Sequence, residues 1–237
     1  MENPSSFLKI ISAVLLVLVF SIFVFTTSID ANTNSQQATF KSLSYKGNLL
    51  LKYPQVYGIN KNAANKINSA FKKAAEKSLK TYLAVKKAEK GVPKKELCKK
   101  TVRCKYSFNS LYKVKYNSNG KLSIYYSEYT YTGGSHGKTE VSMYNFDLST
   151  GRPYNINDIL KTSCTYKKVQ KYAFNYLSTH EPYSDSVVES SDVTVNQNTP
   201  FSFSNDGIYL FFTDYKKYEP SYDDGNPFIE IPKSVYK

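Results

Sequence analysis

The sequence contains few of the residues on which most enzyme chemistry depends. Its 237 residues include two histidines, three cysteines and no tryptophan. A metal site normally needs three or four ligands, and the cysteine spacing matches no known metal pattern. A G-x-S-x-G nucleophile motif, a phosphate-binding loop and a dinucleotide-binding fingerprint are all absent from the sequence. We therefore expect a protein that is not an enzyme and that uses no metal or cofactor.

Acidic residues are scarce in the first half of the chain. Residues 38–118 contain 20 Lys and Arg against 3 Asp and Glu, whereas residues 119–237 contain 11 against 14. An asymmetry of this size indicates a basic surface that faces an anionic partner. The simpler alternative is a Lys-rich helix that is merely solvated.

An uncharged, apolar run covers residues 10–29, and a helix of that length spans the hydrocarbon core of a bilayer. Lys9 precedes the run and Asp30 follows it, which predicts a cytoplasmic N-terminus and an extracellular remainder. A cleaved signal peptide is the alternative, although the run is longer than the usual apolar region of such peptides. The predicted organisation is a cytoplasmic stub (1–9), a transmembrane anchor (10–29), a linker (30–39), a basic helix-containing part (40–118) and a C-terminal part (119–237).

The hydrophobic pattern beyond the linker favours an α+β fold. Apolar residues spaced as on one helix face predict a long amphipathic helix over 63–87, and a shorter helix is predicted over 166–177. Alternation with period two predicts an antiparallel meander of three strands. The predicted strands are 40–53, ended by Pro54, then 106–116, 122–132 and 141–148, and finally 201–203, 208–213 and 228–231. The fold class is thus an antiparallel sheet with one long helix and one or two shorter helices, preceded by a single transmembrane helix.

Three cysteines leave the disulfide pairing open. An extracellular location permits disulfides, and Cys98 and Cys104 are close enough in sequence to bridge. Three pairings are possible, each leaving one thiol, and three reduced thiols are the alternative.

Two neighbouring segments carry a recognisable signature. Residues 131–137 read YTGGSHG, and residues 144–151 read YNFDLSTG. These segments resemble the extracytoplasmic domain family shared by the anti-sigma factor RsiV and the N-terminal part of the peptidoglycan deacetylase PdaC. That family usually has alanine where this chain has Ser135. With weaker similarity in the flanking segments, the resemblance covers nearly all of residues 40–237.

The resemblance implies an α+β domain outside a single membrane anchor. RsiV senses lysozyme and holds a sigma factor through a cytoplasmic domain, but here only residues 1–9 are predicted to be cytoplasmic, so sigma-factor binding is not expected. PdaC carries a separate hydrolase domain that this sequence does not include, so its activity is not expected to transfer. Because lysozyme is itself basic, its binding would require the acidic second half of this chain.

The glycine-rich segment supplies the first set of predicted binding residues. These are Tyr131, Thr132, Gly133, Gly134, His136 and Gly137. His136 would act as a recognition contact or as an acid/base, oriented by Glu128, Glu140 or Asp147. The simpler interpretation is structural: the three glycines adopt positive φ in a tight connection, and His136 hydrogen-bonds the backbone there.

The predicted long helix supplies the second set of binding residues, Lys72, Lys73, Lys77 and Lys80. Outside a cell of the Gram-positive type, the available polyanions are teichoic acids and anionic lipid headgroups, whereas nucleic acid lies on the wrong side of the membrane. The sequence thus predicts a non-enzymatic, membrane-anchored binding or sensing domain at the bacterial cell envelope. Its expected partners are the cell membrane and anionic wall polymers or peptidoglycan. One alternative is an enzyme that acts on cell-wall glycan with His136 as acid/base. Another is a binder of a secreted lytic enzyme such as lysozyme.

Overall fold

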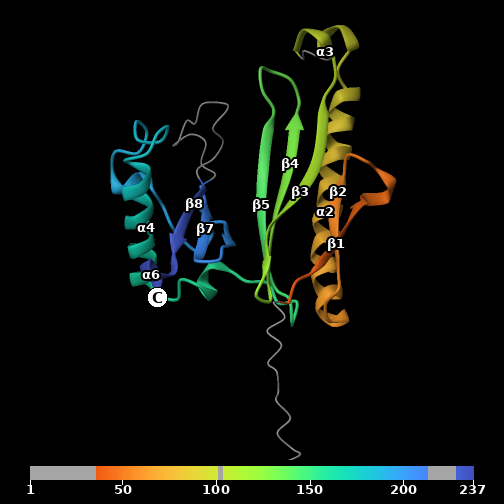
Figure 1. The fold of residues 1–237 in the computed structure, drawn as a ribbon. Coiled ribbons are helices and arrows are strands. Elements are labelled where there is room, and N and C mark those ends of the chain that lie inside the picture. The colour runs from red at the N-terminus through yellow and green to blue at the C-terminus, as the bar shows by residue number, and fades with distance from the viewer. Residues whose placement is uncertain (1–35, 101–103, 213–227) are drawn as a thin grey trace, which may run out of the picture. The chain divides into compact units, whose positions relative to one another are not determined.

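The structure is a computed structural model that describes residues 36–100, 104–212 and 228–237 (Figure 1). The strands are β1 (Thr39–Ser44), β2 (Lys52–Tyr57), β3 (Ser107–Ser118), β4 (Lys121–Tyr131), β5 (Lys138–Asp147), β6 (Phe201–Phe203), β7 (Gly207–Phe211) and β8 (Phe228–Pro232). The helices are α2 (Lys61–Lys90), α3 (Lys94–Lys100), α4 (Ser163–Leu177) and α6 (Lys233–Tyr236). Short 3-10 turns are η1 (Tyr45–Gly47), η2 (Ile156–Asp158) and η3 (Ser190–Asp192).

Helix α2 is the longest helix of the fold and packs against the strands. The Asn60 side chain caps its first turn by accepting from the amides of Asn62 and Ala63 at 2.9 and 3.3 Å. Ile67 and Phe71 of its apolar stripe are fully buried in one core cluster with residues of β4 and β5, whereas Ala75 and Val85 belong to a second cluster. The predicted helix is confirmed and is one turn longer than its apolar pattern, since Lys-rich ends continue it in solvent.

Strands β3, β4 and β5 form the predicted antiparallel meander. The turn between β3 and β4 places Asn119 and Gly120 at φ of 51° and 69°, which asparagine and glycine tolerate best. The division predicted at residues 118 and 119 falls at this turn. Both predicted parts of the domain therefore contribute strands to one sheet.

The prediction of one strand over residues 40–53 is wrong. Two strands, β1 and β2, pair antiparallel across η1, and Pro54 lies inside β2 opposite Ser42. Proline is tolerated there because β2 meets β3 only at the bridge between Leu51 and Ser110, so no hydrogen-bond ladder requires an amide on that edge.

A second three-stranded antiparallel sheet, β6-β7-β8, packs with α4 and α6 around its own core. Buried Leu177 and Val169 of α4 and Ile208 and Ile231 of the sheet belong to this core. The predicted turn over residues 204–207 and the strands beside it are confirmed, and Thr213 lies outside the described residues.

The described residues thus form an α+β fold with antiparallel sheets and four helices, three of them shorter than α2 rather than the predicted one or two. Ser35–Lys237 make up one compact unit. Among the described residues, no helix has the length and apolar character needed to cross a membrane. The predicted transmembrane segment, residues 10–29, lies outside the described residues.

Candidate functional site

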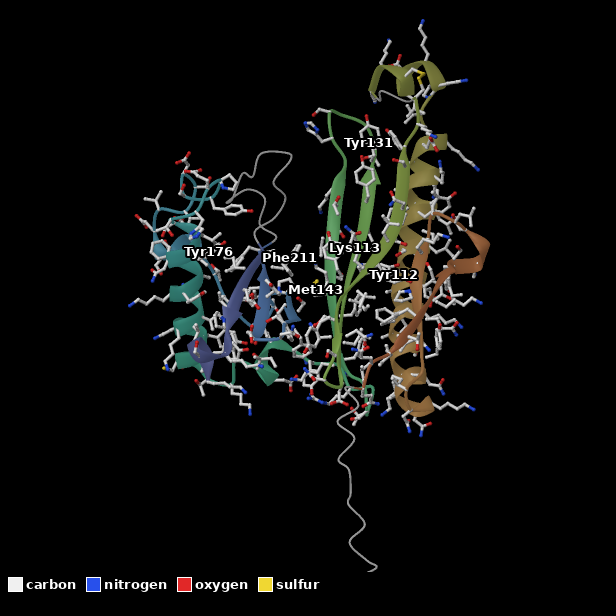
Figure 2. All side chains as sticks on the ribbon, viewed as in Figure 1. Tyr112, Lys113, Tyr131, Met143, Tyr176 and Phe211 are labelled. Carbon is white, nitrogen blue, oxygen red and sulfur yellow. A yellow bond between two sulfur atoms is a disulfide. The ribbon has the colours of Figure 1, made fainter. Side chains whose placement is uncertain are left out.

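The predicted glycine-rich binding segment, residues 131–137, forms the connection between β4 and β5. We call it the signature loop. Figure 2 shows Tyr131 at the loop end of β4, and its hydroxyl donates to the Gly134 carbonyl at 2.9 Å. The Gly134 amide donates to the Lys100 carbonyl, also at 2.9 Å. The loop is therefore fastened to the end of the basic helix α3.

Two of the three loop glycines behave as the structural interpretation expects. Gly133 and Gly134 adopt φ of 104° and 87°, which side-chain-bearing residues rarely reach. Gly137 does not have positive φ, so that part of the interpretation is wrong. Instead, a Cβ at Gly137 would overlap the Tyr129 ring, so glycine is needed there for close approach.

His136 is exposed on the loop. The three carboxylates considered as its orienting partners have other hydrogen-bond donors. Glu128 accepts from Ser78 at 2.8 Å, and Glu140 pairs with Lys138 at 2.8 Å. Asp147 is at the far end of β5, paired with the first residue of β4. The described residues include no cluster of three or more His, Cys, Asp or Glu side chains that could hold a metal ion.

A disulfide between Cys98 and Cys104 ties α3 to the chain leading into β3. Cys164, the third cysteine, is free and exposed. One of the possible pairings is therefore realised, and it braces the helix that carries Lys100 next to the signature loop.

The lysines predicted on α2 do not form a single group. Lys72, Lys73 and Lys80 are exposed and make no salt bridge within the described part of the chain. Lys77 instead lies 3.9 Å from the Glu128 carboxylate on β4. Lys77 is thus part of the contact between α2 and the sheet as well as of its basic surface.

A buried polar network lies beneath Lys77. The Ser78 hydroxyl is 2.9 Å from the Tyr126 hydroxyl and donates to Glu128 at 2.8 Å. Burial raises the pKa of Tyr126, and hydrogen bonds to Ser110 and Ser78 oppose that shift. These groups satisfy one another inside the α2–sheet contact and are closed to solvent, so they serve packing rather than ligand binding.

The second segment of the signature, residues 144–151, covers the end of β5 and the turn that follows it; we call it the signature strand. The Asp147 Oδ1 atom accepts from the amides of Ser149 and Thr150 at 3.0 and 2.8 Å and from both of their hydroxyls. Partial burial would raise the pKa of Asp147, but these hydrogen bonds and one from Tyr154 outweigh it and hold the pKa at about 2.

Asn145 of the signature strand joins the two three-stranded sheets. Its Nδ2 atom donates to the Phe201 carbonyl of β6 at 2.8 Å, and its Oδ1 atom accepts from the Ser123 hydroxyl at 2.6 Å. The Ser123 oxygen in turn accepts from the Phe203 amide at 2.9 Å. The network is buried, so the signature strand determines how the sheets pack together.

The structure therefore separates the predicted site residues into two surfaces. The signature loop lies at the end of the β4–β5 hairpin beside α3. Lys72, Lys73 and Lys80 project from the face of α2 that is opposite its buried stripe. Sequence reasoning also missed a surface hollow beside Leu49 and Leu50, two residues assigned to a strand that are in fact exposed.

Comparison with known proteins matches residues 29–139 to the family of the deacetylase PdaC. Over 168 residues the chain is 27% identical to the peptidoglycan-N-acetylmuramic acid deacetylase PdaC of Bacillus subtilis strain 168, covering 69% of this chain and 34% of the relative. The chain thus spans about a third of the length of this curated relative.

Solved structures of the DUF3298 family are also similar. A member from Bacteroides fragilis aligns with 85% of this chain and 93% of its own, with a TM-score of 0.54 and 18% identity. A member from Pseudomonas aeruginosa covers 55% of this chain and 60% of its own, with a TM-score of 0.44 and 19% identity. The fold of the Bacteroides protein, the family match and the Bacillus relative together confirm the resemblance inferred from the signature: the chain is similar to the PdaC family over residues 29–139.

Proposed function

We propose that this protein is a membrane-anchored, extracytoplasmic binding domain that holds anionic polymers of the bacterial cell envelope on the exposed face of α2. It is a non-enzymatic protein in this proposal, with residues 10–29 as the anchor and the described unit outside the membrane. The Bacillus relative's name places that protein at peptidoglycan, which supports an envelope location for this chain.

The observation that carries the proposal is a line of lysines along α2. Lys73, Lys80 and Lys87 are seven positions apart, so each lies nearly above the last, separated by about 10.5 Å along the helix axis. All three are exposed and make no salt bridge among the described residues. A row of free cations at regular intervals suits a flexible polymer with repeated negative charges, such as a teichoic acid.

Few acidic groups on α2 compete with this row. Glu89 is occupied by Lys86, at 2.6 Å, and by the Tyr106 amide. Glu76 is the other acidic residue of the helix. The basic surface continues past the end of α2 into α3, where Lys94, Lys95 and Lys100 are exposed. Much of the charge excess of the sequence is therefore carried by the helices α2 and α3, as the proposal requires.

The alternative of a glycan-active enzyme finds no support in the signature loop. His136 is exposed, Glu128 accepts a hydrogen bond from Ser78, and Glu140 pairs with Lys138. The Bacillus relative is named a deacetylase, but only 34% of it matches this chain, and the activity belongs to that whole protein.

A binding assay with the full chain in phosphatidylcholine nanodiscs tests the proposal. We expect binding to purified wall teichoic acid that weakens steeply as salt is raised. Changing Lys73, Lys80 and Lys87 together to Gln should weaken binding about 100-fold, at about 1 kcal/mol for each lysine. A matched triple change of exposed Lys167, Lys168 and Lys171 on α4 should have little effect. Salt-insensitive binding, or equal losses in both triple variants, would contradict the proposal.

The location is tested separately. A reporter enzyme that works only outside the cytoplasm, fused after Lys237, should be active in cells. Activity of a cytoplasmic reporter at the same position would overturn the predicted orientation.

A further inference from the structure

The first described residues after the predicted membrane anchor are fixed at one end of the fold. The Gly120 amide, in the turn between β3 and β4, donates to the Gln36 carbonyl at 3.2 Å, and the Ala38 amide donates to the Asn117 side chain at 2.8 Å. Figure 1 shows this turn at the same end as the start of α2 and as α6, whereas α3 lies at the opposite end. We call the end that contains Gly120, the first turn of α2 and α6 the proximal end.

Few residues separate the proximal end from the apolar run. Only residues 30–35 lie between the run at 10–29 and Gln36. A fully extended chain spans at most about 3.6 Å for each residue, so residue 29 and Gln36 are no more than about 25 Å apart. This inference rests on the proposed function, in which residues 10–29 cross the bilayer. The proximal end is then the part of the fold that is tethered close to the lipid headgroups.

Lysines from elements distant in the sequence gather at the proximal end. We call them the proximal lysines: Lys61 at the start of α2, Lys121 at the start of β4, and Lys233 and Lys237 at the two ends of α6. Lys121 is half-buried and the other three are exposed. None of the four makes a salt bridge within the part of the chain that the structure describes. Their positive charge is therefore available to an anion.

The surroundings of Lys121 show that these amines repel one another. Burial lowers the pKa of Lys121 most, the charges of Lys233 and Lys237 lower it further, and Asp147 opposes the shift. The Lys121 Nζ atom also lies 4.9 Å from the centre of the Phe203 ring, a contact that leaves its charge in place. Because a nearby anion favours the charged form of a lysine, an anionic group at this end would relieve the repulsion.

The carboxylates at the proximal end neutralise little of this charge. Asp147 accepts hydrogen bonds from the turn that follows β5, and Asp158 pairs with Arg152 at 2.9 Å. Asp206 is exposed, and its carbonyl accepts from the Lys233 amide, so it adds one carboxylate beside α6. The first turn of α2 contains no acidic residue, although the helix dipole favours one there. The proximal end thus has an excess of positive charge.

We propose that the proximal end rests on anionic phospholipid headgroups, which the proximal lysines contact. The signature loop and α3 then point away from the membrane, since β3 and β4 lead away from this end for 12 and 11 residues, about 35 Å. A wall polymer carries similar charge, but the short tether holds the bilayer surface at this end at a high effective concentration. Anionic lipid is therefore the occupant that the position of these lysines favours.

Energy transfer from a labelled thiol to dye-labelled lipid tests this inference on the full chain in nanodiscs. Cys164 is free and exposed at the start of α4, which packs against α6 near the proximal end (Figure 1), whereas the other two cysteines form the disulfide. A maleimide donor therefore labels position 164. A second chain, with Cys164→Ser and Ser135→Cys, places the donor on the exposed signature loop. The discs contain phosphatidylcholine alone or an equal mixture with phosphatidylglycerol.

We expect transfer from position 164 to be higher in the phosphatidylglycerol mixture than in phosphatidylcholine alone. This rise should disappear at about 1 M salt, where the Debye length is about 3 Å. Transfer from position 135 should not rise, because the signature loop is at the other end of the fold.

Changing the three exposed proximal lysines, Lys61, Lys233 and Lys237, to Gln should weaken the lipid contact about 100-fold and so remove the rise at position 164. The matched control changes Lys94, Lys95 and Lys100 of α3 to Gln, which are equally exposed and make no salt bridge among the described residues, and should keep the rise. Thermal unfolding curves check that both triple variants retain the fold.

Equal transfer in the two kinds of disc, or an equal loss in the two triple variants, overturns the proposal. An equal rise at positions 135 and 164 would show that the domain lies along the membrane, which also overturns it. A chain that does not enter phosphatidylcholine discs contradicts the anchor of the proposed function and this inference with it. A chain that enters them and shows no dependence on phosphatidylglycerol overturns this inference alone.

Discussion

The two segments of the family signature lie on consecutive parts of one hairpin, yet they differ in solvent exposure and in hydrogen bonding. The signature loop (Tyr131–Gly137) is mostly exposed, and one backbone hydrogen bond fastens it to α3. The signature strand (Tyr144–Gly151) is mostly buried or half-buried, and its Asn145 and Asp147 side chains are saturated with hydrogen bonds. A sequence signature can therefore combine buried residues that maintain the fold with residues that lie exposed at the surface.

The signature strand is structural because three separate elements meet on it. Asn145 reaches β6, Phe146 and Leu148 enter the core under α2, and Gly151 lies against the first turn of α2. In the loop, Gly134 bonds Tyr131 and Lys100, and Gly137 lies against the Tyr129 ring. Substitutions in the signature strand should therefore lower stability much more than substitutions in the signature loop.

The largest effect is expected at Asn145. Replacing it with Ala leaves the Phe201 carbonyl and the Ser123 hydroxyl without their buried partner, and should lower the free energy of unfolding by about 3 kcal/mol. Urea unfolding followed by circular dichroism measures the change. Exposed Asn175 on α4 is the control, where Ala should cost no more than about 0.5 kcal/mol. Similar costs at both positions would contradict the structural role of the signature strand.

A pair of glycines gives the next contrast. An alanine at Gly151 would be strained at φ of 71°, and its Cβ would lie 2.6 Å from the Ala63 carbonyl oxygen. We expect Gly151→Ala to cost about 2 to 3 kcal/mol. Gly134→Ala, in the signature loop, has φ of 87° but open space around the Cβ, and should cost about 1 kcal/mol. The same unfolding assay compares them, and a larger cost at Gly134 would reverse the comparison.

Lowering the pH should remove the contribution of the Asp147 carboxylate to the free energy of unfolding. The pKa of Asp147 is about 2 in the folded protein and about 3.9 in an unfolded chain. Because the folded value is the lower one, the ionised carboxylate stabilises the fold above about pH 4, and this contribution is lost as the pH falls toward about 2. Solvent screening limits it to about 1 kcal/mol.

The check is the stability difference between wild type and Asp147→Asn. It should be present at about pH 6 and should shrink toward zero at about pH 2.5. A difference that is unchanged across this range would show that the Asp147 charge does not stabilise the fold.

The smallest effect is expected at His136 in the signature loop. His136→Ala should change the free energy of unfolding by no more than about 0.5 kcal/mol, since the side chain is exposed. It should also leave any release or deacetylation of peptidoglycan fragments at the level of the unmodified protein. An activity that the unmodified protein has and this variant loses would favour the glycan-enzyme alternative over the proposed binding domain.

Periodicity alone was enough to predict the regular elements. Eight buried positions of α2 recur on one face of the helix, and the residues of β3 and β4 alternate between the core and the other face, so local burial and secondary structure agree. The asparagine–glycine turn between these strands was predictable for the same reason, because its backbone conformation depends on the two residues themselves.

The predictions that were wrong concern residues whose environment is set by a segment distant in the sequence. Pro54 lies within a strand because the neighbouring strand does not need its amide, and Gly137 is constrained by the Tyr129 ring rather than by its own φ. Leu49 and Leu50 look like strand core in the sequence, yet the Asn48 turn holds them in solvent. None of these partners is encoded in the local pattern.

The sequence by itself determined the fold class, the long basic helix and the family resemblance, because hydrophobic period, charge composition and motif spacing are all local properties. Only the tertiary structure decided which signature residues are buried and which are exposed, and that Lys77 lies near Glu128 while Lys73 and Lys80 make no salt bridge within the described residues. It also created the hollow beside β3. Burial and hydrogen bonding between segments far apart in the chain depend on where those segments meet, which no local pattern specifies.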